Sequence, residues 1–137
     1  MAHRVFIDSS AWLAVLDKND PHHSEAVELY DRLLKSQTVF VTTILVVAET
    51  QIVLRRRAGH GTAVAFLKNA NESPRIKIIY PDAQLEAEAK RILHQYQDQD
   101  FSLADAISFA FMRQNGLTEA FAYDRHFATA GFTISAE

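Results

Sequence analysis

The chain has 137 residues, of which 48% are hydrophobic and 23% charged, the balance and length of a single globular domain spanning residues 1–137. It contains no cysteine, which excludes disulfides, thiolate catalysis and cysteine-ligated zinc, and the lack of a long apolar run or a signal peptide predicts a cytoplasmic protein that does not enter a membrane. The net charge is −3, so a nucleic-acid ligand would need locally concentrated basic residues or a metal site that neutralises acidic side chains.

The first half of the chain alternates short apolar runs with amphipathic stretches, which predicts alternating strands and helices. Strands are expected at residues 5–7 and 38–41. Each of the first three helices has residues that favour its start: Ser9 or Ser10 for the first, Asp20 before Pro21 for the second, and Thr42 or Thr43 for the third. Gly59 should end the third helix, and a shorter helix containing Phe66 should follow.

The second half continues the same alternation. A strand is expected at residues 76–80, and a long amphipathic helix begins at Asp82. Ser102 and Asp105 have capping-box spacing at the start of a further helix. The remaining segments that read as strands are residues 120–123 and 132–134. The pattern predicts an α/β fold with a mostly parallel sheet of four or five strands covered by helices on both faces, and ligand sites in such sheets lie beyond the carboxyl ends of the strands.

Four acidic residues stand out by their positions. Asp8 and Asp124 each follow a predicted buried strand directly, which places both at the carboxyl edge of the sheet, although aspartate is also a common turn or cap residue after a strand. Glu49 is the only charged residue between Thr42 and Leu54, on or beside an apolar helix face. A buried carboxylate there needs compensation, for example by a metal. The alternatives are an ion pair with a distant lysine or arginine, or a position on the rim of the apolar stripe.

Asp105 lies in the first turn of its helix, where the helix dipole favours a carboxylate and capping alone would explain it. Its neighbours one or two turns away are nevertheless apolar: Phe101, Phe109 and Met112.

The four carboxylates together suggest a metal site. Carboxylates that converge repel one another and raise one another's pKa, so a fold keeps such a cluster where cations or shared protons occupy it. Oxygen ligands without histidine or cysteine select Mg²⁺ or Mn²⁺ rather than zinc. Those ions suit phosphodiester hydrolysis.

The ordered set of acidic motifs resembles that of the PIN-domain nucleases, and a chain this short resembles the VapC-like toxins within that family. The resemblance covers nearly the whole chain, and its four motifs are Ile7-Asp8-Ser9-Ser10, Val47-Ala48-Glu49-Thr50, Ser102-Leu103-Ala104-Asp105-Ala106 and Tyr123-Asp124-Arg125-His126-Phe127.

The resemblance implies a three-layer α/β/α sandwich, metal-dependent endoribonuclease activity, a homodimer and a small antitoxin partner. It assigns Asp8 and Asp105 as principal metal ligands, with Asp124 and Glu49 completing the acidic pocket. Ser9 and Ser102 would be supporting polar groups at its mouth. The likeness also implies Mg²⁺ or Mn²⁺ as cofactor and RNA as substrate.

Basic side chains gather at two places. Arg55 and Arg56 belong to a run of three arginines at the end of the helix that carries Glu49, and they are candidate RNA contacts, although arginines also suit the negative end of a helix dipole. Arg125 and His126 directly follow Asp124 and are candidate RNA contacts as well. His22 and His23 stand at the start of a helix, in an expected solvated first turn, and His3, His60 and His94 show no metal-ligand spacing with one another.

Two rival interpretations remain. A catalytically silent PIN-like module would bind RNA or protein and use its carboxylates structurally. A phosphotransfer protein would need an acidic pair at the first strand or a second aspartate two residues after the first, whereas Ser9 and Ser10 follow Asp8. With four glycines and no glycine-rich loop, a dinucleotide-dependent oxidoreductase is excluded.

Overall fold

The computed structural model describes residues 3–135, which form five strands and seven helices that alternate along the chain. The strands are β1 (Arg4–Ile7), β2 (Val39–Thr43), β3 (Ile76–Ile79), β4 (Glu119–Phe121) and β5 (Thr133–Ile134). The helices are α1 (Ser9–Leu16), α2 (His23–Lys35), α3 (Ile44–Ala58), α4 (His60–Glu72), α5 (Ala83–Gln95), α6 (Leu103–Gln114) and α7 (His126–Thr129). No helix in this part of the chain is both long and apolar enough to cross a membrane.

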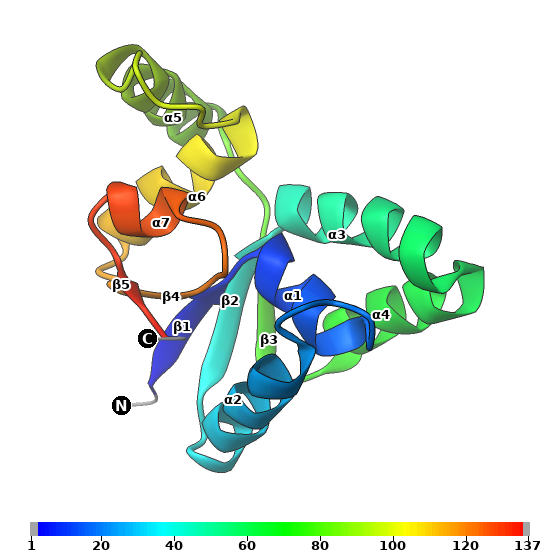
Figure 1. Ribbon diagram of the computed structural model, residues 1–137. Helices are drawn as coiled ribbons and strands as arrows, with labels where there is room; N and C mark the ends of the chain where they lie inside the picture. Colours follow the sequence, from blue (N-terminus) through cyan, green and yellow to red (C-terminus); the bar gives the residue numbers. More distant parts are fainter. Residues whose placement is uncertain (1–2, 136–137) are drawn as a thin grey trace.

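The five strands form one parallel sheet in the order β3-β2-β1-β4-β5. The chain moves outward from β1 through β2 to β3 and then returns to the other side of β1 to form β4 and β5. Because crossovers between parallel strands are right-handed, this reversal puts α1–α4 on one face of the sheet and α5–α7 on the other (Figure 1). The predicted three-layer α/β/α architecture is confirmed, and the described strands are all parallel.

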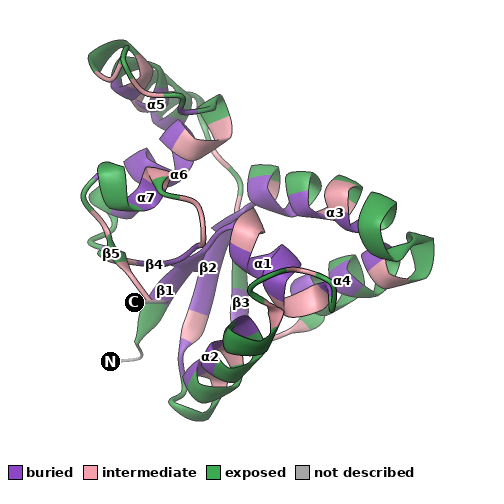
Figure 2. Cartoon of the chain, in the orientation of Figure 1, coloured by how far each residue is buried: buried purple, intermediate pink, exposed green. Residues whose placement is uncertain are grey.

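The strands are buried on both faces, as their uninterrupted apolar sequences predict (Figure 2). Val5, Phe6 and Ile7 of β1 have no exposed surface. Aromatic side chains extend this core into the helical layers: Phe109 of α6 packs edge-on against Phe127 of α7. The core holds β1 and β4 rigidly at the centre of the sheet, where the acidic residues follow them.

Several helix boundaries agree with the sequence. Thr43 caps α3 by accepting a hydrogen bond from Val46 N, Asp82 caps α5, and Ser102 and Asp105 form the predicted capping box of α6. Gly59 ends α3 with a φ of 94°, in the left-handed region that favours glycine.

Other boundaries differ from the prediction. Asp8 caps α1, because its carboxylate accepts the Ser10 amide; Ser9 and Ser10 are already inside the helix. Helix α2 begins at His23 rather than at Pro21, since Asp20 accepts the His22 amide and holds the chain in a turn first. Strand β4 ends at Phe121, so Asp124 follows it after two further residues. The four-residue helix α7 was not predicted, because it is too short to give a periodic pattern.

Candidate active site

The candidate active site lies at the carboxyl ends of β1 and β4. These neighbouring strands lead into connections that run in opposite directions across the sheet, and ligands of open parallel sheets bind at such a reversal. Asp8 follows β1 directly, and its amide donates a 3.1 Å hydrogen bond to the carbonyl of Phe121 at the end of β4. The sequence prediction that Asp8 stands at this edge is confirmed.

Ser10 fixes the position of the Asp8 carboxylate. Its hydroxyl donates to Oδ2 of Asp8 at 2.9 Å and accepts from the Tyr123 amide, also at 2.9 Å. One side chain therefore links α1 to the segment that carries Asp124. The sequence indicated Ser10 as a helix cap and as part of the first acidic motif, and no local pattern signals a contact across 113 residues.

The surroundings of the Asp8 carboxyl group disfavour its ionised form. Asp8 is only 3% exposed. Burial raises the pKa of Asp8 well above its ordinary value, and the neighbouring carboxylate of Asp124 raises this pKa further. The Ser10 hydroxyl lowers it by less than either of these effects, and the carboxylate of Asp105 adds the smallest contribution, which raises it. At neutral pH the group is held in a place that disfavours its negative charge, so the site favours a proton or a cation.

Asp105 approaches the same cluster from α6. Its Oδ2 accepts the Ser102 amide at 3.0 Å and lies 3.1 Å from Nδ1 of His126. Asp124 is held by the His126 amide, which donates to its Oδ1 at 2.9 Å. One ligand atom from each of Asp105, Asp124 and His126 lies within 4.8 Å of the others. His126 thus faces the acidic cluster, although the sequence suggested it only as an RNA contact.

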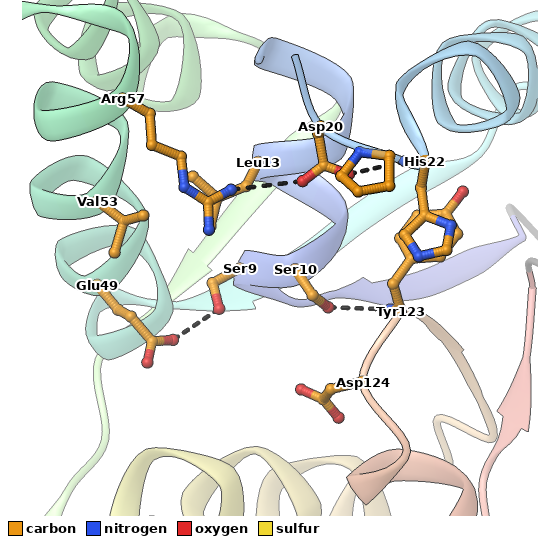
Figure 3. A pocket seen from close by; sticks show the side chains of 11 residues that line it. Ser9, Ser10, Leu13, Asp20, His22, Glu49, Val53, Arg57, Tyr123 and Asp124 are labelled. Carbon is orange, nitrogen blue, oxygen red and sulfur yellow. Dashed lines mark hydrogen bonds and ion pairs between the residues drawn. The ribbon is translucent and has the colours of Figure 1, made fainter. Parts of the chain in front are cut away.

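Glu49 lies across the site on α3. Its Oε1 accepts a 2.7 Å hydrogen bond from the hydroxyl of Ser9, the predicted supporting group (Figure 3). Glu49 is exposed, which agrees with the alternative that it stands on the rim of its apolar stripe. The same side of α3 carries Val53 and Arg57 one and two turns later, and all three border an open pocket instead of the core.

This pocket has a volume of about 390 Å³ and opens beside Asp124, between α1, α3 and the loop that joins α1 to α2 (Figure 3). The side chains that line it come from these three elements and from the segment after β4: Ser9, Ser10, Leu13, Asp20, Pro21, His22, Glu49, Val53, Arg57, Tyr123 and Asp124. A second hollow of about 320 Å³ lies on the other side of Asp124 and is lined in part by Arg125.

The structure therefore separates the predicted site residues into groups. Asp8, Asp105 and Asp124 come together, and Glu49 lies at the wall of the adjoining pocket. Ser102 lines none of these hollows; it acts on Asp105 through its amide and through its hydroxyl, which caps the Asp105 amide at 3.0 Å.

Of the three consecutive arginines, only Arg57 lines the pocket, and Arg55 and Arg56 are exposed elsewhere on the last turns of α3. The spacing of eight residues from Glu49 was the available signal, because residues four apart share one face of a helix.

The donor set fits a hard divalent cation. Three carboxylates and one imidazole are ligands that Mg²⁺ or Mn²⁺ accepts, with Mn²⁺ the more tolerant of nitrogen. The Asp8 carboxylate is buried, and its surroundings disfavour its negative charge. A bound cation would offset that charge.

The family model for the PIN domain matches residues 5–133. The chain belongs to the PIN-domain family. Among curated proteins, the 23S rRNA-specific endonuclease VapC20 of Mycobacterium tuberculosis is 34% identical over 128 residues, covering 93% of this chain and 95% of that protein. Ribonuclease VapC26 of the same species is 32% identical over 102 residues, which cover 74% of this chain and 73% of that protein. The resemblance to VapC-like proteins is confirmed.

Solved structures agree. The crystal structure of Mycobacterium tuberculosis VapC20, described as a sarcin-ricin loop cleaving toxin, superposes with a TM-score of 0.84 at 35% identity and covers 94% of this chain and 96% of that one. FitAcB from Neisseria gonorrhoeae has a TM-score of 0.62 at 17% identity over 95% of each chain, which shows a shared fold.

Proposed function

We propose that this chain is a metal-dependent endoribonuclease that hydrolyses RNA phosphodiester bonds and is the toxin of a toxin–antitoxin pair. The observation that carries the proposal is the buried Asp8 carboxylate beside Asp124 and Asp105 at the reversal point of the sheet. The endonuclease and toxin activities of relatives that match nearly the whole chain support the same reaction class.

We propose Asp8, Asp105 and Asp124 as the metal ligands, with Glu49 completing the acidic pocket and Mg²⁺ or Mn²⁺ as the ion. When bound, the ion supplies Lewis-acid stabilisation of the charge on the phosphoryl oxygens and lowers the pKa of water. A carboxylate cluster alone would repel the phosphate backbone, so substrate binding depends on that positive charge and on the arginines at the rim.

The protein's own residues position this chemistry. Ser10 and Ser102 hold Asp8 and Asp105 by the hydrogen bonds described above, so neither carboxylate needs to reorganise when substrate arrives. Ser9 holds Glu49 at the far side of the pocket. With the ion bound, water would attack the phosphorus and the bond from phosphorus to the 3′-oxygen would break, which would leave a 5′-phosphate and a 3′-hydroxyl and would require no protein nucleophile.

The partners follow from this role. We propose a small antitoxin as the inhibitory partner, because a toxin of this class acts in a cell that must also restrain it. We propose the cytoplasm, where RNA is available, as the site of action.

We also propose a homodimer. Leu45 and Leu103, each more than a third exposed, border a hollow of about 460 Å³ between the starts of α3 and α6, an apolar surface that a second copy would cover. The whole chain would act as one nuclease domain.

The deciding experiment is cleavage of a mixed structured RNA pool by the purified protein with Mg²⁺ or Mn²⁺ and then with EDTA, beside the nearly isosteric Asp8→Asn variant. Cutting that requires metal and disappears in the variant supports the proposal. Equal cutting by wild type and variant would identify a contaminating nuclease. RNA binding without cutting under any metal condition would favour the alternative, a silent PIN-like binding module.

A further inference from the structure

The pocket beside Asp124 contains features that the metal site does not use. Its lining includes a cation, Arg57 of α3, and, across the pocket from it, a stacked pair of rings, His22 and Tyr123 (Figure 3). Neither ring nor the guanidinium belongs to the acidic cluster. The pocket volume of about 390 Å³ falls within the range of roughly 300–1,000 Å³ that is usual for small-molecule sites.

His22 and Tyr123 form a flat aromatic step at one side of the pocket. Their ring centroids are 4.3 Å apart, and the ring planes are inclined by only 11°. Tyr123 therefore covers one face of the imidazole, and the imidazole Nδ1 lies 2.8 Å from Oε1 of Glu25, while the His22 side chain remains 47% exposed. An exposed flat ring that is already supported from behind is the kind of surface on which an unpaired nucleobase stacks.

Arg57 is held in place at the opposite wall. Its Nη1 lies 3.4 Å from Oδ2 of Asp20 and 3.8 Å from Oδ2 of Asp17, two carboxylates whose side chains are only 11% and 8% exposed. Both contacts use the same guanidinium nitrogen. Among residues 3–135 no hydrogen bond is made by its Nε or Nη2, so these donors are available to a ligand in the pocket. A guanidinium with free donors in a fixed plane matches the geometry of a phosphate group.

The pocket and the second hollow lie on either side of the acidic residue Asp124. Asp124 lines this pocket and the second hollow as well, and the second hollow contains the exposed Arg125. The cluster thus separates two recesses, each with an arginine. An RNA strand whose scissile phosphate lies at the cluster would place one neighbouring nucleotide in each recess.

We infer that the pocket formed by His22, Tyr123 and Arg57 is a nucleotide subsite that takes one unpaired nucleotide of the RNA, with its base stacked on His22 and its phosphate paired with Arg57. The inference rests on the proposed ribonuclease function. It assigns specificity for single-stranded segments to these residues, because a base inside a duplex cannot reach the face of His22. It also gives a role to His22, which sequence analysis left without one.

The test is binding of a short fluorescein-labelled, single-stranded oligoribonucleotide, measured by fluorescence anisotropy with Ca²⁺ in place of Mg²⁺ or Mn²⁺, so that a hard divalent cation can occupy the acidic cluster. A gel of the same samples checks that the oligoribonucleotide stays intact. His22→Ala removes the stacking ring and should raise Kd roughly 5- to 150-fold, the range found when one base-stacking side chain is removed. His22→Phe keeps a flat ring and should retain most of the affinity. Arg57→Gln should weaken binding. It should also reduce the slope of log Kd against log salt concentration by the amount that corresponds to about one lost phosphate contact. Arg57→Lys keeps the positive charge and should restore part of that slope.

Two controls separate these effects from general losses of charge or folding. Arg32→Gln removes an exposed cation from α2, and His60→Ala removes an exposed histidine at the start of α4, and both residues lie outside the pockets described above. Both should bind as wild type does. Each variant is checked by thermal unfolding, because Arg57 also pairs with Asp17 and Asp20.

The inference is overturned if folded His22→Ala and Arg57→Gln bind the oligoribonucleotide as tightly as wild type, or if wild type binds a duplex of the same sequence equally well. It is overturned as well if wild type does not bind the single strand. The subsite and the proposed ribonuclease function can fail separately. If wild type cleaves RNA but both variants bind as tightly as wild type, only the subsite is rejected. Lost binding in the variants of a protein that cuts no RNA would keep the subsite and remove the nuclease.

Discussion

The hydroxyl of Ser9 donates a 2.7 Å hydrogen bond to Oε1 of Glu49, and this bond joins the first turn of α1 to the middle of α3 across the mouth of the site. Glu49 is exposed, so burial does not fix its side chain, and the Ser9 hydroxyl is what holds it toward the pocket. The contact predicts that Ser9 matters for activity more than for stability.

We expect Ser9→Ala to lower the rate of RNA cleavage by roughly 10- to 100-fold, the usual effect of removing a group that orients a site carboxylate. The free energy of unfolding should change by no more than about 0.5 kcal/mol, because the lost bond lies at the surface. Single-turnover cleavage and urea denaturation measure the two quantities. Ser9→Thr retains the hydroxyl and serves as the control; equal losses of activity in both variants would contradict a role for the hydrogen bond.

The buried Asp8 carboxyl predicts a dependence of stability on pH. Since burial and Asp124 raise the pKa of Asp8 in the folded state, the folded protein retains a proton that the unfolded chain releases near the ordinary value of 3.8. The contribution of Asp8 to stability is therefore fully present below that value and is lost as the pH rises through the raised pKa.

We accordingly expect Asp8→Asn to be more stable than wild type in EDTA at neutral pH, with a difference that shrinks as the pH falls toward about 4. Added Mn²⁺ at about 100 times its Kd should stabilise wild type by about 2.7 kcal/mol and the variant by much less. Thermal unfolding at a series of pH values, with and without the ion, measures both effects. If Asp8→Asn is less stable than wild type at every pH, the negative charge of Asp8 does not destabilise the folded protein.

The 3.1 Å contact between His126 Nδ1 and Asp105 predicts that this histidine acts on the metal site. We expect His126→Ala to raise the Mn²⁺ concentration for half-maximal cleavage roughly 10- to 100-fold, with a smaller loss of rate at saturating ion. His126→Asn, which keeps a donor near Asp105, should be affected less. If His126 serves instead as an RNA contact, KM for RNA will rise while the dependence on Mn²⁺ stays unchanged.

The proposed homodimer makes a separate prediction. Leu45 and Leu103 are 36% and 40% exposed beside the same hollow, so a charge placed there should oppose burial of this surface against a second copy. We expect Leu45→Glu to convert a dimer into a monomer by light scattering coupled to size-exclusion chromatography. Val64→Glu, at a 46% exposed position on α4, is the matched control and should leave the mass unchanged. A wild-type monomer would contradict the homodimer itself.

Much of this protein was predictable from its sequence because the relevant signals are local. An apolar run such as residues 5–7 must be covered on both faces, and the residue that follows it must emerge at the sheet edge, which places Asp8. The capping box of Ser102 and Asp105 spans one turn of helix, so its spacing alone predicted the hydrogen bonds that hold Asp105.

Only the tertiary structure decided which side chains meet across long stretches of chain. The Ser10 hydroxyl binds the Tyr123 amide, His22 stacks on Tyr123, and His126 turns toward Asp105; the partners in each contact come from different elements, and no periodicity relates them. The exposure of Glu49 could not be decided from the sequence for the same reason. Its helix face is apolar in sequence, but whether such a face meets the core or a pocket depends on how α3 packs against α1 and α4, which is set by the sum of many distant contacts rather than by any residue nearby.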